Sequence, residues 1–150
     1  MIVKLSNRKR AIKERADKLA ENRDKWIARN SYFYNDDYNY MNFLVNDGQR
    51  VLELGCGTGQ LLNALKPSYG VGVDLSANMV DIAQKNYPNL EFIQGDLEDK
   101  HLISSLQGPF DFILLSDTIG YLDDCENAFA GDGSYLASTS MKDGSSSVVP

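Results

Sequence analysis

The amino-acid sequence predicts an α/β fold in which a doubly wound parallel sheet carries helices on both faces. Short apolar runs of strand length alternate along the chain with segments whose apolar residues recur at helical spacing. A polar or acidic residue follows each apolar run, at the edge where open α/β sheets bind their ligands. Four runs show this pattern, at residues 51–54, 69–74, 90–94 and 110–115.

Before the first run the sequence predicts two helices. A long helix is expected over residues 7–30, because neither glycine nor proline interrupts it. A shorter helix is expected over about residues 36–45, in a segment with five aromatic residues between Tyr32 and Tyr40. The apolar residues of the long helix form a narrow stripe that should pack against the edge or top of the sheet domain. They are Ile12, Ala16, Leu19, Trp26 and Ile27.

Boundary residues place the helices between the runs. Pro67 ends the helix after the first run, and Ser76 caps the helix after the second run, at residues 77–86. Weaker helical patterns follow the third and fourth runs, at residues 98–106 and 122–129.

The first strand leads directly into a glycine-rich turn, Gly55-Cys56-Gly57-Thr58-Gly59, and then into a helix. Glycine lacks a Cβ and accepts positive φ, so a ligand can lie against bare backbone at such a turn. The turn also directs the first amides of the helix at the ligand. The order of strand, glycine turn and helix therefore predicts a site for a small polar or charged ligand.

Charge is distributed unevenly along the sequence. Residues 1–30 hold 10 Lys or Arg and 4 Asp or Glu, a net charge of +6, whereas the other residues hold 5 and 17, a net charge of −12. A basic helix can contact nucleic acid, but an acidic chain is a poor partner for phosphate backbones. We therefore expect the N-terminal helix to lie solvated against an acidic body, with no nucleic-acid partner.

Composition also limits the compartment and the kind of site. No apolar run reaches the ~20 residues of a membrane helix, and residues 1–4 lack the apolar core of a signal peptide. We expect Cys56 and Cys125 to be free thiols in a reducing cytoplasm, with no membrane partner. One histidine and no cysteine–histidine cluster argue against a metal centre.

The spacing of the glycine turn separates two kinds of nucleotide-binding fold. Dinucleotide-binding folds show G-x-G-x-x-G, whereas the present run is Glu53-x-Gly55-x-Gly57-x-Gly59. This run closely resembles motif I of the class I S-adenosylmethionine-dependent methyltransferases, and the resemblance covers about residues 26–129. It implies a Rossmann-like fold with S-adenosylmethionine as the cofactor. The resemblance is to the small-molecule branch, because the Asn/Asp-Pro-Pro-Tyr signature of nucleic-acid amino-methylating members is absent after the fourth strand.

Acidic residues at the strand ends have predicted roles. Asp74 lies 19 residues after Gly55, where a carboxylate can accept hydrogen bonds from two ribose hydroxyls in either kind of fold. The resemblance implies that Asp96 and the backbone of Leu97 contact adenine, and that Glu53 lies near the ammonium group of the cofactor. The predicted cofactor-binding residues are Tyr34, Glu53, Gly55, Cys56, Gly57, Thr58, Gly59, Asp74, Leu75, Met79, Asp96, Leu97 and Ser116.

Within this set, Leu75 and Met79 are expected as apolar walls for adenine and ribose, and Tyr34 is expected to close over the methionine end. Methyl transfer from a sulfonium leaves a neutral thioether, so the reaction needs no acid. A base is needed only for a weakly acidic acceptor. Asp117 and His101 are candidates for that base, and neither is assigned.

The sequence departs from the family pattern near its end. Class I methyltransferases have seven strands and only about four are expected here, so the predicted sheet is incomplete. Three parts are expected: an N-terminal helical cap (1–46), a partial cofactor-binding domain (47–130) and a flexible Ser/Gly-rich tail (131–150). The strand at residues 110–115 would then have an unpaired edge, open to self-association or to cover by the N-terminal helix or the tail.

The function expected from the resemblance is methyl transfer from S-adenosylmethionine to a small-molecule acceptor. Two alternatives remain open. The missing strands favour a non-catalytic cofactor-binding or interaction module. A fragment of an NAD-dependent oxidoreductase is disfavoured by the glycine spacing and by the absence of a substrate domain.

Overall fold

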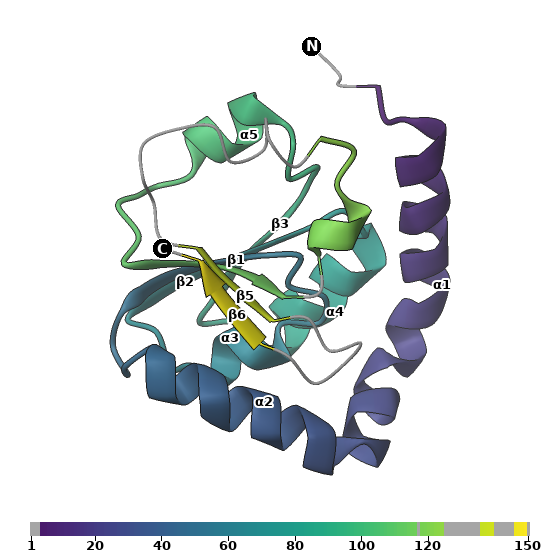
Figure 1. Cartoon of the computed structure of the whole chain (residues 1–150). Helices are drawn as coiled ribbons and strands as arrows, with labels where there is room; N and C mark the ends of the chain where they lie inside the picture. Colours follow the sequence, from purple (N-terminus) through teal and green to yellow (C-terminus); the bar gives the residue numbers. More distant parts are fainter. Residues whose placement is uncertain (1–3, 117, 125–135, 140–145, 150) are drawn as a thin grey trace.

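The computed structural model describes residues 4–116, 118–124, 136–139 and 146–149, and a sheet lies at its centre (Figure 1). The strands of the described residues are β1 (Arg50–Leu54), β2 (Tyr69–Asp74), β3 (Glu91–Gln94), β4 (Phe112–Ser116), β5 (Leu136–Thr139) and β6 (Ser146–Val149). They lie in the order β3-β2-β1-β4-β5-β6, and all neighbours are parallel except β5 and β6. The four parallel strands predicted from the sequence are therefore present.

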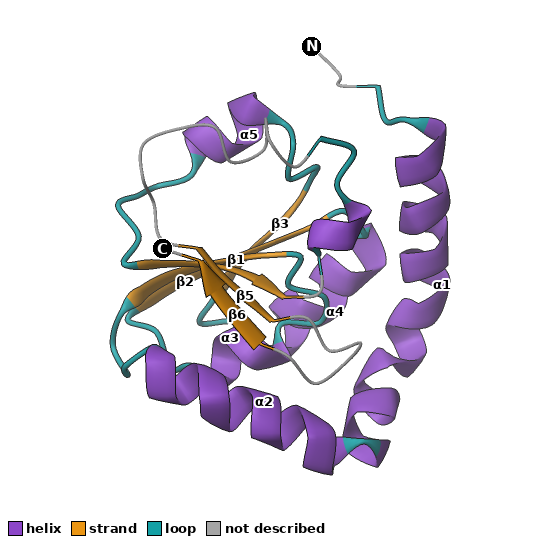
Figure 2. Cartoon of the chain, in the orientation of Figure 1, coloured by secondary structure: helices purple, strands orange, loops and turns teal. Residues whose placement is uncertain are grey.

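Helices cover both faces of this sheet (Figure 2). They are α1 (Asn7–Arg29), α2 (Ser31–Leu44), α3 (Gln60–Ala64), α4 (Ala77–Asn86) and α5 (Lys100–Ser105), with a 3-10 turn, η1 (Ile119–Tyr121). Apolar residues of α2, α3 and α4 pack against one face, and those of α5 pack against the other. The doubly wound, Rossmann-like α/β fold predicted from the sequence is confirmed.

The centre of the sheet is β1, which pairs with β2 on one side and β4 on the other. Leu52 lies opposite Val71 and Ile113 in these two pairings. The order of the strands along the chain reverses between β1 and β4, and in open α/β sheets ligands bind beyond the carboxyl ends at such a point. The glycine turn begins at this end of β1.

Capping side chains set where several helices begin. The hydroxyl of Ser6 accepts a hydrogen bond from the amide of Lys9 at 3.1 Å, and Ser76 accepts from the amide of Met79 at 3.2 Å, as predicted for α4. The carboxylate of Asp99 caps α5, which therefore begins slightly later than expected. The second helix begins at Ser31, directly after α1, so it is longer than the sequence indicated.

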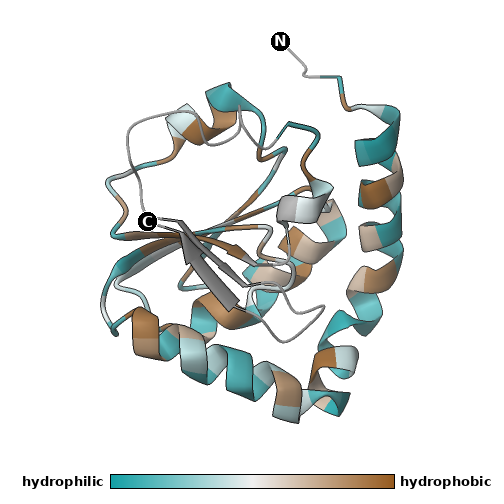
Figure 3. Ribbon diagram, viewed as in Figure 1, coloured by the Kyte–Doolittle hydropathy of each residue, from teal (hydrophilic) through white to brown (hydrophobic). Residues whose placement is uncertain are grey.

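The apolar stripe predicted on α1 is only partly buried. Leu19 is 51% exposed and Trp26 is 56% exposed, whereas Ile27 and Ala20 are the buried apolar residues of this helix. Apolar and polar residues alternate along α1 in Figure 3. In the described part of the chain, no helix is both long and apolar enough to cross a membrane.

Part of the segment expected to be a flexible tail extends the sheet. β5 pairs with β4, with Leu136 opposite Ile113, and β6 pairs with β5. The edge of β4 is therefore not left unpaired: part of the expected tail covers it, which is one of the alternatives expected for this edge. The two added strands are short and rich in serine and threonine, so main-chain pairing rather than an apolar run defines them.

The helix expected over residues 122–129 is not formed at residues 122–124. Residues 125–129 lie outside the described residues, as do residues 131–135, 140–145 and 150 of the expected tail.

Candidate functional site

A cavity of about 700 Å³ lies between α1 and the carboxyl ends of the central strands. A smaller cavity, of about 70 Å³, adjoins it beside α2, because Arg23, Tyr34, Gly55 and Gly57 line both. We call them the large cavity and the small cavity. The large cavity has the volume of a typical small-molecule site.

The three glycines of the turn differ in what they face. Gly55, Gly57 and Gly59 all have positive φ, at 82°, 54° and 82°. A Cβ at Gly55 would clash with the hydroxyl of Thr118, and one at Gly59 would lie 2.6 Å from the ring of Phe92. A Cβ at Gly57 would meet no atom within 4 Å, and this residue borders both cavities. Gly57 is therefore the position where a ligand can approach bare backbone.

Asp74 ends β2 and holds the glycine turn in place. Its Oδ2 accepts a hydrogen bond from the amide of Gly57 at 2.8 Å, and its Oδ1 accepts from the amide of Ser76 at 2.9 Å. Burial raises the pKa of this carboxyl group, and the two amides oppose that shift. Since each carboxylate oxygen can accept more than one hydrogen bond, Asp74 can still accept from a ligand in the large cavity.

Asp96 follows β3, borders the large cavity and is paired with α1. The Nζ of Lys9 lies 2.6 Å and 2.7 Å from the two carboxylate oxygens of Asp96, and it also contacts Glu98. Burial alone would lower the pKa of Lys9, but hydrogen bonds to the two carboxylates raise it above its usual value. Lys9 is therefore a charged, buried ammonium between two carboxylates.

Other polar side chains connect α1 to the loops after the remaining parallel strands. Asp24 accepts a hydrogen bond from the hydroxyl of Thr58 at 2.6 Å, in the turn after β1. Asp17 accepts from the hydroxyl of Ser76 at 2.5 Å, after β2. Arg8 donates to backbone carbonyls that follow β4. Together with the lysine ion pair, these contacts hold α1 across the carboxyl ends of four strands, where it covers the large cavity.

Glu53, near the carboxyl end of β1, borders the small cavity. Its side chain is only 1% exposed, and the amide of Leu62 is hydrogen-bonded to its carboxyl group. Among the described residues, nothing donates a hydrogen bond to its Oε2. Burial, reinforced by the charge of Asp74, raises the pKa of Glu53 to about 8. A buried oxygen without a partner at a cavity wall is an acceptor that a ligand can satisfy.

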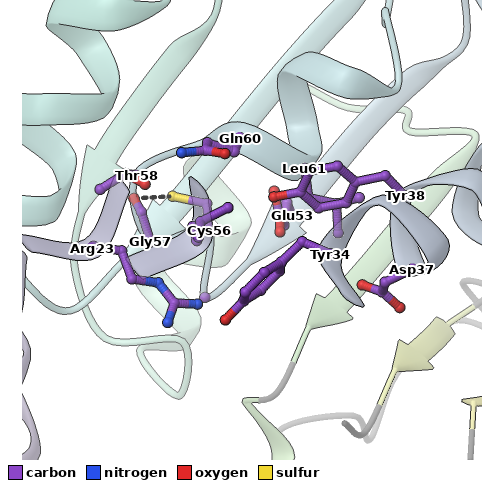
Figure 4. A pocket seen from close by; sticks show the side chains of 12 residues that line it. Arg23, Tyr34, Asp37, Tyr38, Glu53, Cys56, Gly57, Thr58, Gln60 and Leu61 are labelled. Atoms are coloured by element: carbon purple, nitrogen blue, oxygen red, sulfur yellow. Dashed lines mark hydrogen bonds between the residues drawn. The ribbon is translucent and has the colours of Figure 1, made fainter. Parts of the chain in front are cut away.

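Side chains of the N-terminal helices complete the wall of the small cavity (Figure 4). The guanidinium carbon of Arg23, from α1, lies 5.7 Å from the ring centroid of Tyr34, from α2. The rings of Tyr34 and Tyr38 lie with their centroids 6.3 Å apart. Burial, followed by the charge of Glu53, raises the pKa of Tyr38, so this hydroxyl stays neutral.

Residues 51–136 match the family model of the methyltransferase domain, which is more than half of the chain. The chain belongs to this methyltransferase family. The prediction of a class I S-adenosylmethionine-dependent methyltransferase domain, made from the glycine spacing, is thereby confirmed.

Relatives of this methyltransferase domain differ in their substrates. It is 33% identical over 85 residues to malonyl-[acyl-carrier protein] O-methyltransferase of Halalkalibacterium halodurans, across 52% of this chain and 31% of that protein. A Thermotoga maritima structure described as a possible histamine N-methyltransferase has a TM-score of 0.65 and 27% identity, covering 81% of this chain and 58% of that one.

A third similar structure was solved with its cofactor in place. The magnesium protoporphyrin IX methyltransferase of Synechocystis, solved with bound S-adenosylmethionine, has a TM-score of 0.65. The two chains are 16% identical, and the match covers 91% of this chain and 77% of the Synechocystis chain. It shows that the two proteins share a fold. The chain spans about a third of the length of the curated relatives it matches.

The structure brings most of the predicted residues of the methyltransferase site to the two cavities. Gly59 precedes α3, lies close to the ring of Phe92 and borders neither cavity. Ser116 ends β4, and its side chain is outside the described part of the structure, as is Asp117. His101 is exposed on α5. The residues that line a cavity are Tyr34, Glu53, Gly55, Cys56, Gly57, Thr58, Asp74, Leu75, Met79, Asp96 and Leu97.

Sequence reasoning missed Lys9 and Arg23, although a signal for both was present. They continue the three- and four-residue spacing of Ile12, Ala16 and Leu19 on α1, and all five residues line the large cavity. A stripe that carries a charge at each end fits the wall of a polar cavity better than a hydrophobic core. This placement also accounts for the exposure of Leu19.

Proposed function

We propose that this methyltransferase domain binds S-adenosylmethionine in the large cavity, with the amino-acid end of the cofactor in the small cavity. The observation that carries the proposal is the placement of three carboxylates. Glu53, Asp74 and Asp96 belong to three adjacent strands or the loops after them, and all three border the adjoining cavities. Their order from β1 to β3 matches the order of ammonium, ribose and adenine along the cofactor.

In this proposal the ribose hydroxyls donate to the lone pairs of Asp74 that the backbone amides leave open. The adenine amino group donates to Asp96, which keeps its ion pair with Lys9, since each carboxylate oxygen accepts more than one hydrogen bond. Leu75 and Met79 border the large cavity as apolar surface for the adenine and ribose.

The bound cofactor supplies an electrophilic methyl group and departs as a neutral thioether. The protein's part is to hold this methyl group in line with the acceptor and away from water. Positioning of two reactants can contribute ~7–11 kcal/mol to lowering the barrier. We assign no catalytic residue, because positioning alone can account for the chemistry of this step.

For the acceptor we propose a small molecule. The proteins named above support this, since one is named for the malonyl group of malonyl-[acyl-carrier protein] and another is described as a possible histamine N-methyltransferase. Two basic side chains of α1 are used in internal pairs, Lys9 with Asp96 and Arg8 with Asp123, which supports a site without a nucleic-acid partner. The buried, free thiol of Cys56 supports a reducing, cytoplasmic location.

Calorimetric titration with S-adenosylhomocysteine and, in parallel, with NAD tests the proposed cofactor. We expect S-adenosylhomocysteine to bind and NAD not to bind. Tighter binding of NAD would overturn the proposal. Turnover of S-adenosylmethionine against a panel of small acceptors then distinguishes an enzyme from a non-catalytic binding module.

A further inference from the structure

The wall that α1 contributes to the large cavity is rich in positive charge. The basic side chains of α1 that line the cavity are Arg8, Lys9, Lys13, Arg15 and Arg23. The first three each form an ion pair with a carboxylate of a described residue. Arg23 stands where the two cavities meet, over the ring of Tyr34. Arg15 is exposed, lines the large cavity but not the small one, and forms no hydrogen bond or ion pair with a described residue. Its guanidinium is therefore free to bind an anionic group in the large cavity.

Apolar side chains flank Arg15 on the same face of α1. Ile12 lies three residues before it and Leu19 four residues after it, which is the spacing of neighbours on one face of a helix, and both line the large cavity. Leu19 is about half exposed although it lines a cavity, so it stands at the opening rather than in the interior. From Ile12 to Leu19 this strip extends ~10 Å along the helix axis. The opening therefore carries an apolar strip with one free cation in it.

A second element contributes exposed apolar surface to the same cavity. The turn η1 follows β4 and lies beside the first half of α1 (Figure 1), where Arg8 donates to the carbonyl of Gly120 at 2.6 Å. Tyr121 of η1 is 54% exposed and lines the large cavity. Among the described residues, Leu19 and Tyr121 are the exposed large apolar side chains that line it. A ligand with an apolar body would remove both from water, which favours its binding.

We propose that the methyl acceptor is an apolar organic acid, whose carboxylate is bound by Arg15 and whose apolar body is covered by Leu19 and Tyr121. This inference rests on the proposed function, which leaves the class of small molecule open, and it makes Arg15 a specificity-determining residue. A guanidinium binds a carboxylate through two parallel hydrogen bonds, and these charge-assisted bonds are stronger than neutral ones.

The distribution of charge in the large cavity favours this orientation of the acceptor. The carboxylates that line it, Asp74 and Asp96, belong to the ends of strands or the loops after them, where they would repel an acid group. The acid group is therefore expected on the side of α1. At about 700 Å³, the cavity lies in the upper part of the ~300–1,000 Å³ range of small-molecule sites, which suits a cofactor together with an acceptor.

Straight-chain probes of equal length separate the contribution of charge from that of apolar contact. The chain is saturated with S-adenosylhomocysteine, and decanoate, decanol and decylamine are then titrated by calorimetry, each below the concentration at which it aggregates. We expect decanoate to bind about 5- to 10-fold more tightly than decanol, and decylamine to bind most weakly of the three. Butyrate carries the acid group without the long apolar body, so it should bind more weakly than decanoate.

Variants of α1 test each contact separately. Arg15→Met should weaken decanoate about 5- to 10-fold, to the affinity of decanol, and leave decanol unchanged. Leu19→Ser should weaken decanoate and decanol by the same factor. Arg29→Met is the matched control, because Arg29 is an exposed arginine of α1 that lines neither cavity and forms no hydrogen bond or ion pair with a described residue. It should bind decanoate as the unmodified chain does.

The outcomes are distinguishable from failure of the proposed function. If the unmodified chain does not bind S-adenosylhomocysteine, the proposed function fails. If it binds S-adenosylhomocysteine but binds decanoate no more tightly than decanol, only the class of acceptor is wrong. Equal weakening of decanoate by Arg15→Met and Arg29→Met would show a general effect of charge and would overturn the assignment of Arg15. Weaker binding of S-adenosylhomocysteine to Arg15→Met would place this residue in the cofactor site and would also overturn it.

Discussion

In the proposed site, Glu53 would make cofactor binding a proton-linked event. With a pKa of about 8, its carboxyl group is mostly protonated near neutral pH when the cavity has no ligand. A cofactor ammonium beside it would favour the carboxylate and lower its pKa. Binding of S-adenosylhomocysteine at about pH 7 should therefore release about one proton. Calorimetry in buffers with different ionisation enthalpies measures the number released.

The same measurement at higher pH checks this prediction. At about pH 9.5 the carboxyl group is already ionised, so the release from Glu53 should disappear. Glu53→Gln keeps the shape of the side chain and has no proton to lose. If this variant released as many protons as the unmodified chain at neutral pH, another group would be responsible.

In the proposed site, Gly57 is the residue whose missing side chain would make room for the cofactor. In Gly57→Ala the positive φ of 54° costs ~1–2 kcal/mol of stability, and the added methyl group points into open space beside the cavities. We expect affinity for S-adenosylhomocysteine to fall by about 10- to 100-fold, as for overpacking worth ~1–3 kcal/mol. Titration of the folded variant measures this loss.

Gly48→Ala is the control for backbone strain. Gly48 has a φ of 81° and lines neither cavity, and a Cβ added there would meet no atom within 4 Å. This variant should lose similar stability and keep its affinity. Unchanged affinity in Gly57→Ala as well would show that the cofactor does not touch this turn.

At the scale of the helix, α1 depends on one buried cation. The side chains of Lys9, Asp96 and Glu98 are 8%, 12% and 14% exposed. Lys9→Met would leave two buried carboxylates without their cation, a change that costs ~3–5 kcal/mol in buried pairs. We expect a lower midpoint of urea unfolding, and weaker binding of S-adenosylhomocysteine because the cover of the large cavity is loosened.

Lys18→Met removes the same charge from an exposed position of α1 and is the comparison for that experiment. Its unfolding midpoint should stay close to that of the unmodified chain. Equal midpoints for the two lysine variants would mean that the ion pair does not hold α1 in place.

At the scale of the whole molecule, the uneven charge of the sequence becomes an internal interface. The basic first helix meets acidic residues in the loops after β3 and β4, through the pairs of Lys9 with Asp96 and of Arg8 with Asp123. This agrees with the sequence-based expectation of a basic helix lying against an acidic body. Beyond β4, part of the segment expected to be a tail forms β5 and β6, which charge and composition did not predict.

The sequence by itself determined the central strands, the glycine turn and the acids at the strand ends. These features follow from short-range rules: an apolar run forms a strand, glycine permits the turn, and parallel strands bring their carboxyl ends to one edge. Glu53, Asp74 and Asp96 could therefore be predicted without knowing any contact between distant residues.

Only the tertiary structure decided which residues cover the carboxyl ends of the strands. The pairing of Lys9 with Asp96 joins residues 87 positions apart, and no local pattern specifies the path by which α1 crosses the sheet. The same docking places Arg23 beside Tyr34 and leaves Glu53 buried without a hydrogen bond to Oε2 from any described residue. Side-chain partners of this kind depend on the packing of whole helices, because burial and ion pairing are set by surfaces that meet only in the folded chain.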